Sequence, residues 1–72
     1  MEYGLRLLEA MELFNSGYPI KISLFYGDKK VFSAVYDRHD FGEQEFLLFE
    51  NIIHNILKYS DKTEDDLIFE VV

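Results

Sequence analysis

Cysteine is absent from the sequence, so neither a disulfide nor a thiolate metal site can stabilise the fold. There is also no apolar run long enough to span a bilayer and no basic leader at the start, so we expect a cytoplasmic protein. The four glycines do not have the spacing of a dinucleotide-binding or phosphate-binding loop. These absences argue against disulfide-rich, membrane-spanning and nucleotide-binding classes.

Basic residues are also scarce. Seven lysines and arginines stand against fourteen aspartates and glutamates, which gives a net charge of −7. This charge disfavours direct binding to nucleic acid or to anionic membranes, and it favours basic protein surfaces as partners. The alternative is that the charge serves only solubility. Because 49% of the residues are hydrophobic, we expect a folded chain rather than a disordered one, with a single domain over residues 1–72.

The sequence offers little chemistry for catalysis. No nucleophile is placed beside a base, and no carboxylate pair or metal set is evident. Asp37, His39 and Asp40 carry suitable ligand atoms, but three ligands within one short turn seldom point at one ion. We therefore expect a non-enzymatic protein without catalytic residues, cofactor or metal.

A first helix is predicted over residues 3–15. Apolar residues recur there at helical spacing, and Ser16-Gly17 provides a glycine exit. The opposite face of this helix would carry Glu2, Glu9 and Glu12, with Leu5 set among them. Such a face combines acidic and apolar groups, so it is a candidate for contact with a partner.

A second helix is predicted over residues 41–59. Asp40 followed by Glu43 fits a capping box, which would start the helix near Phe41, and the apolar side that follows would include Tyr59. Leu47 is the exception, because it would project among polar residues. It is either a scattered surface leucine or a contact with a partner.

Three strands complete the predicted order of helix, strand, strand, helix, strand. Residues 20–26 and 31–36 are rich in β-branched and aromatic side chains and flank a turn at residues 27–30, and residues 67–72 form the last strand. We therefore predict an α+β fold in which two helices cover one face of a small antiparallel or mixed three-stranded sheet.

Side chains alternate between the two faces of a strand, and here both faces are substantially apolar. Two helices can cover only one of them. The uncovered face would carry Phe25, Val31, Val35, Ile68 and Val72. A chain of this size buries only about 60% of its unfolded surface, so additional burial would stabilise it. We therefore expect a homodimer, joined through the open sheet face or through an edge strand.

The acidic residues suggest a function for such a protein. Carboxylates held on a rigid framework can resemble DNA phosphates, and a DNA-binding protein would then accept them in place of DNA. The alternative for each group is an ordinary solvated face. The candidate acidic residues are Glu2, Glu9 and Glu12 in the first helix, Asp37, Asp40, Glu43, Glu45 and Glu50 around the second, and Glu64, Asp65, Asp66 and Glu70 near the end.

In size, charge and absence of cysteine, the chain resembles the small acidic inhibitors that phages make against host proteins that handle DNA. In addition, Gln44-Glu45-Phe46-Leu47-Leu48-Phe49 is similar to the Q-x-x-L-x-F peptide that docks on the bacterial replication sliding clamp, with Gln44 and Leu47 on the pattern. The resemblance implies a DNA-mimic inhibitor in the host cell cytoplasm, with the clamp as first candidate target. The alternative is an adaptor or antitoxin-like module that binds its partner through the apolar sheet face.

Overall fold

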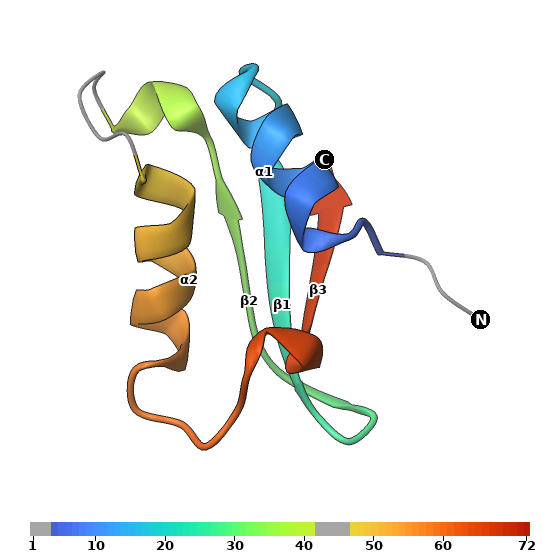
Figure 1. The fold of residues 1–72 in the computed structure, drawn as a ribbon. Coiled ribbons are helices and arrows are strands. Elements are labelled where there is room, and N and C mark those ends of the chain that lie inside the picture. Colours follow the sequence, from blue (N-terminus) through green and yellow to red (C-terminus); the bar gives the residue numbers. More distant parts are fainter. Residues whose placement is uncertain (1–3, 42–46) are drawn as a thin grey trace.

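The computed structural model describes residues 4–41 and 47–72 (Figure 1). It confirms an α+β fold with the predicted order of two helices and three strands. The elements are α1 (Leu7–Asn15), β1 (Ile20–Tyr26), β2 (Lys29–Tyr36), the short 3-10 helix η1 (Arg38–Asp40), α2 (Leu48–Leu57), the short 3-10 helix η2 (Glu64–Asp66) and β3 (Leu67–Val71).

The sheet is antiparallel throughout, with β1 in the centre and β2 and β3 at its edges. The β1–β2 hairpin turns at Gly27 and Asp28, so the turn is two residues shorter than expected and pairing begins at Lys29. Gly27 has a φ of 64°, a conformation that costs glycine little. The pairing register shifts between Leu24 and Phe25, which marks a β-bulge next to the turn.

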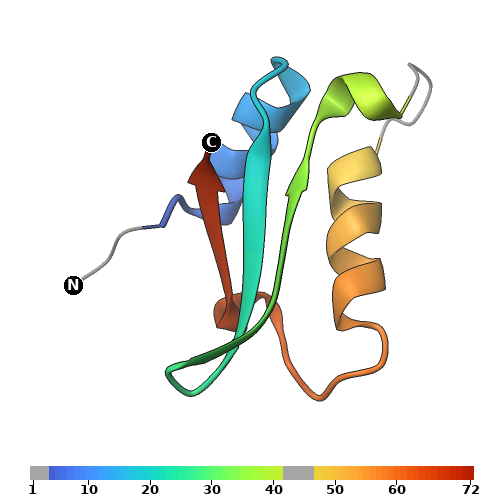
Figure 2. The same ribbon diagram turned by 180° about the vertical axis from the view of Figure 1, so that it is seen from behind.

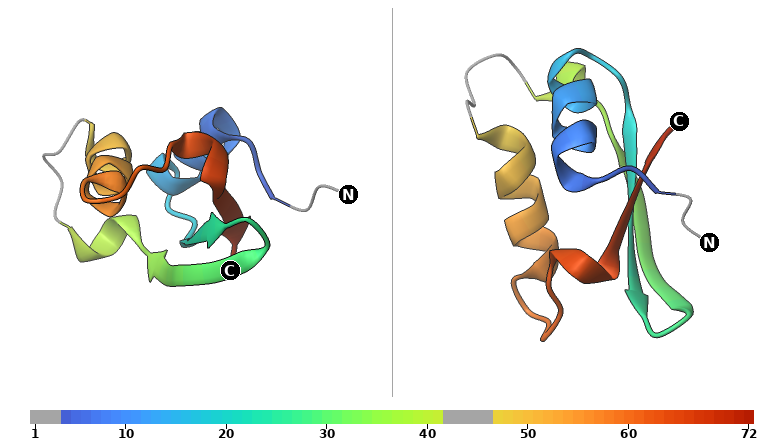
Figure 3. Two further views of the ribbon diagram at one scale, coloured as in Figure 1. Left: turned by 90° about the horizontal axis from the view of Figure 1, so that it is seen from below. Right: turned by 45° about the vertical axis from the view of Figure 1, so that its right-hand side comes forward.

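Both helices lie on one face of the sheet and form a separate layer (Figures 2 and 3). Between the layers is an apolar core centred on Phe49, whose ring centroid is 4.9 Å from that of Phe14 and 5.8 Å from that of Phe69. Rings at this separation and tilt gain attraction beyond their buried area. The buried hydrophobic residues are Ala10, Phe14, Ile20, Ile22, Leu24, Leu48, Phe49, Ile52, Ile53, Leu67 and Phe69.

The predicted start of the first helix was wrong. The helix begins at Leu7 because Arg6 is extended, with a ψ of 160°. Leu5 instead pairs with β3, where its N–H donates to the carbonyl of Phe69 at 2.7 Å, and its side chain packs on the core. Leu5 therefore does not belong to an acidic outer face. The leucine that does lie exposed on α1 is Leu8, at 70%.

The predicted start and end of the second helix were also wrong. Asp40 lies in η1 and Phe41 follows it, whereas α2 begins only at Leu48. Glu43, the other half of the expected capping box, lies outside the described residues. Since α2 ends at Leu57, Tyr59 falls beyond the last turn and is 90% exposed rather than buried. Neither helix in the described ranges combines the length and the apolar character required to cross a bilayer.

Candidate protein-binding surfaces

The face of the sheet turned away from the helices carries the predicted apolar residues, and we call it the open sheet face. Val35 and Val72 are 52% and 68% exposed, Val31 is also exposed, and Phe25 and Ile68 are half-buried. The helices cover only the opposite face of the sheet (Figure 3). These five residues thus lie on one uncovered surface, and their role in a dimer stays a prediction.

Polar residues at the centre of the open sheet face are paired with one another. Ser23 is buried, and its hydroxyl is 3.3 Å from that of Ser33 on β2. Lys21 Nζ lies 3.9 Å from Glu70 Oε1 across the β1–β3 ladder. The face is therefore locally neutral in this region, and its apolar residues surround a small set of satisfied polar groups.

A different set of exposed carboxylates comes from the elements α1, α2 and η2, and we call it the acidic surface: Glu9, Glu12, Glu50, Glu64 and Asp65. All five residues are exposed, and none forms an ion pair with another described residue. Glu9 accepts a hydrogen bond from the N–H of Arg6 at 3.0 Å, which places its carboxylate at the start of α1. Negative charge is favourable there because it faces the positive end of the helix dipole.

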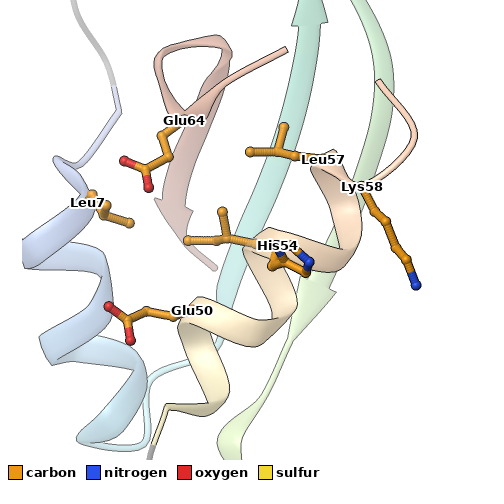
Figure 4. Close-up of a pocket in the computed structure, with 7 residues that line it drawn as sticks. Leu7, Glu50, His54, Leu57, Lys58 and Glu64 are labelled. Atoms are coloured by element: carbon orange, nitrogen blue, oxygen red, sulfur yellow. The ribbon is translucent and has the colours of Figure 1, made fainter. Parts of the chain in front are cut away.

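Glu50 and Glu64 come from different elements but line the same shallow pocket, whose volume is about 420 Å³. Figure 4 shows both carboxylates directed toward the α1 side, near Leu7, while the amino group of Lys58 points away from them. Lys58 Nζ instead lies 5.4 Å from the centre of the Tyr59 ring. Lys58 also lines this pocket, but it forms no ion pair with Glu50 or Glu64.

The other predicted acidic residues do not join this surface. Strand alternation places Glu70 on the open sheet face, beside Lys21, and Asp66 accepts a hydrogen bond from the N–H of Thr63 at 3.2 Å. At the end of β2 that is away from the hairpin turn, Asp37 directly precedes η1 and Asp40 is the last residue of η1. Of the three acidic groups named from the sequence, the described members therefore lie partly on the acidic surface and partly elsewhere. Glu2, Glu43 and Glu45 lie outside the described residues.

Asp37 is held by its own turn. Its Oδ1 accepts from the backbone N–H of His39 at 2.9 Å and lies 2.9 Å from Nδ1 of the same residue. The backbone hydrogen bond, followed by the contact with the imidazole, lowers the pKa of Asp37 from its ordinary value of 3.8.

Within residues 4–41 and 47–72, no three histidine, aspartate or glutamate side chains gather as a metal site would require.

The segment of residues 44–49, which resembles the clamp-docking peptide and which we call the clamp-like segment, is divided between core and surface. Phe49 is only 2% exposed and sits in the aromatic core, so it cannot dock elsewhere while the chain is folded. Leu47 is exposed just before α2, as a contact residue would need to be. Gln44, Glu45 and Phe46 lie outside the described residues.

One surface was not anticipated from the sequence. A groove of about 430 Å³ runs between β2 and α2 and is mostly apolar, and we call it the β2–α2 groove. Phe32 and Phe41 are 38% and 36% exposed there. Partial burial raises the pKa of Tyr36 in the same groove. The lining residues are Leu24, Phe32, Tyr36, Phe41, Ile52, Asn55 and Ile56.

The signal that could have revealed this groove is the strand order. An edge strand that carries two large aromatic residues on its covered face needs a neighbour on its outer side, and a short helix does not fill that space.

Comparisons with protein-family models, with curated proteins and with solved structures find no match to this chain.

Proposed function

We propose that the chain is a non-enzymatic inhibitor that binds a basic DNA-binding protein and occupies its DNA channel or groove. The observation that carries the proposal is the acidic surface, in which Glu50 and Glu64 extend from separate elements toward one gap without a cationic partner among the described residues. Unneutralised carboxylates keep their full attraction for lysine and arginine side chains on a partner.

The distribution of charge supports the same reading. Glu70, the carboxylate on the open sheet face, is matched by Lys21, whereas the acidic surface is not matched in this way. The net charge of −7 adds a long-range attraction to any basic channel. Screening shortens that attraction, with a Debye length of about 10 Å at 0.1 M salt. Binding should therefore weaken steeply as salt is raised.

The bacterial replication sliding clamp is the first candidate target. The burial of Phe49 leaves the Q-x-x-L-x-F segment unable to dock as a peptide, so binding would have to use the basic channel of the clamp.

We also propose that two copies of the chain join through the open sheet face, which would double the number of carboxylates that the protein presents. Val35→Lys should shift such a dimer to monomer in sedimentation at micromolar concentration.

A charge-reversal experiment tests the inhibitory function. Glu9, Glu12 and Glu50 are replaced with lysine together, and binding to the purified clamp is measured by calorimetry at low and high salt. The wild-type chain should bind at low salt and compete with duplex DNA, and the triple variant should lose most of its affinity. The matched control compares two single reversals of equal charge: Glu50→Lys on the acidic surface should weaken binding, whereas Asp28→Lys in the hairpin turn should keep most of the affinity.

The result that contradicts this function is binding that is indifferent to salt and to the triple reversal. That outcome would favour the second candidate, an adaptor or antitoxin-like module that binds through the open sheet face. The exposure of Val31, Val35 and Val72 is the observation in its favour. Val35→Lys would then abolish partner binding, whereas the acidic surface would be dispensable.

A further inference from the structure

The outer edge of β2 is open for pairing. The other edge of the sheet is partly occupied, because the N–H of Leu5 donates to the carbonyl of Phe69 on β3. In the described part of the chain, the backbone hydrogen bonds outside helices and strand ladders involve no residue of β2. An edge of this kind presents unpaired N–H and C=O groups that can receive another strand.

The β2–α2 groove runs along this same edge. Phe32 and Phe41 leave more than a third of their surface exposed beside Ile52 and Ile56 of α2. A strand added to β2 would lie about 4.8 Å from it, and every second side chain would point toward the helix layer. Those side chains would enter the groove and cover the two phenylalanine rings.

We propose that an extended segment of a partner protein binds as a fourth strand along β2, with apolar side chains at alternate positions in the β2–α2 groove and a basic residue beside Asp37 and Asp40. Main-chain hydrogen bonds would supply affinity, and the groove would select the side chains. This surface is separate from the acidic surface, because Ile52 and Ile56 face the groove whereas Glu50 extends toward α1.

The position of the basic residue follows from the charges at the two ends of β2. Asp37 and Asp40 lie on either side of Arg38 at the end where η1 follows the strand, so this end keeps a net negative charge, and the two bonds from His39 hold the Asp37 carboxylate in place. Lys29 and Lys30 lie at the opposite end, next to the hairpin turn. A bound segment is therefore favoured when its lysine or arginine lies at the η1 end.

A second copy of the chain suits this edge less well than a single segment does. In two views α2 lies beside β2 on the helix side of the sheet (Figures 1 and 3). Pairing two β2 edges about a twofold axis would bring α2 of the second copy toward the space next to the first. An extended segment that has no helix of its own avoids this crowding.

The test is a selection of random decapeptides displayed on phage, followed by anisotropy measurements with the enriched peptides. We expect apolar residues at alternate positions and a lysine or arginine at one end. Phe32→Asp should weaken binding about tenfold, the equivalent of ~1.4 kcal/mol. Leu8→Asp, an equally severe change at an exposed leucine of α1, should leave binding unchanged, and circular dichroism should confirm that both variants are folded.

A second measurement does not depend on any variant. Peptides that are N-methylated at alternate residues cannot donate to the edge, so one of the two methylation registers should abolish binding. The proposal is overturned if no peptide is enriched, if enriched peptides lack the alternation, or if both methylated forms bind as well as the parent. It is also overturned if the amide signals of β2 shift with chain concentration alone, because the occupant is then a second copy. None of these results alters the charge-reversal test of the acidic surface.

Discussion

Replacing Phe49 with alanine removes the ring that connects the two layers of the fold. The ring is 2% exposed and packs against Phe14 of α1 and Phe69 of β3. Truncating a buried phenylalanine costs about 3–5 kcal/mol, because transfer free energy is lost and a cavity remains. A domain of 72 residues has a total stability of roughly 4–11 kcal/mol at typical values per residue. Phe49→Ala should therefore remove from about a quarter to all of the stability of the chain at 25 °C.

The assay is urea denaturation followed by circular dichroism, with Leu8→Ala as the matched control. Leu8 is mostly exposed, so its truncation should change the free energy of unfolding by less than about 0.5 kcal/mol. The experiment also separates two roles for the clamp-like segment. If Phe49→Ala kept the wild-type denaturation midpoint and lost only partner binding, then Phe49 would be a docking residue and the account of the core would be refuted.

Three further predictions concern local features. Because the folded-state pKa of Asp37 is lowered, its contribution to stability is present above pH 3.8 and is lost as the pH falls below it, so the melting temperatures of wild type and Asp37→Ala should converge in acid. Lys21→Gln should change the free energy of unfolding by less than about 1 kcal/mol in a double-mutant cycle with Glu70→Gln, because this ion pair is exposed and long. Gly27→Ala should cost about 1–2 kcal/mol in denaturant titrations, since φ is 64° and no atom lies within 4 Å of the added methyl group, whereas Gly27→Asn should cost less.

The sheet was predictable from the sequence because alternation is a local signal. Ile20, Ile22 and Leu24 point to the core, and Val35 lies on the open sheet face, as their spacing indicated. Each strand has few alternative registers once one face is buried. The uncovered apolar face was predictable because the sequence shows two apolar faces on the sheet but only enough helices to cover one of them. This reasoning also requires no knowledge of tertiary contacts.

The helix boundaries were not predictable in the same way. The predicted first helix includes Leu5 on its acidic face, but a backbone hydrogen bond to Phe69, which lies 64 residues away along the chain, holds Leu5 in place instead. Likewise Phe41 fits the apolar side of the second helix, although it lies in the β2–α2 groove. In both cases a long-range contact decided between two local conformations of similar propensity. The groove depends on the strand order, which places β2 at an edge, and local patterns alone do not give that order.

The smallest dimension of the molecule across its Cα atoms is 17 Å, which leaves room for one layer of interior side chains. An inward-facing residue of β1 such as Ile22 therefore belongs to the one apolar core that lies between the helices and the sheet. Two proteins bound on opposite sides of the molecule would be separated by little more than the thickness of its two packed layers. The distance between labels on two such partners should then be short and narrowly distributed.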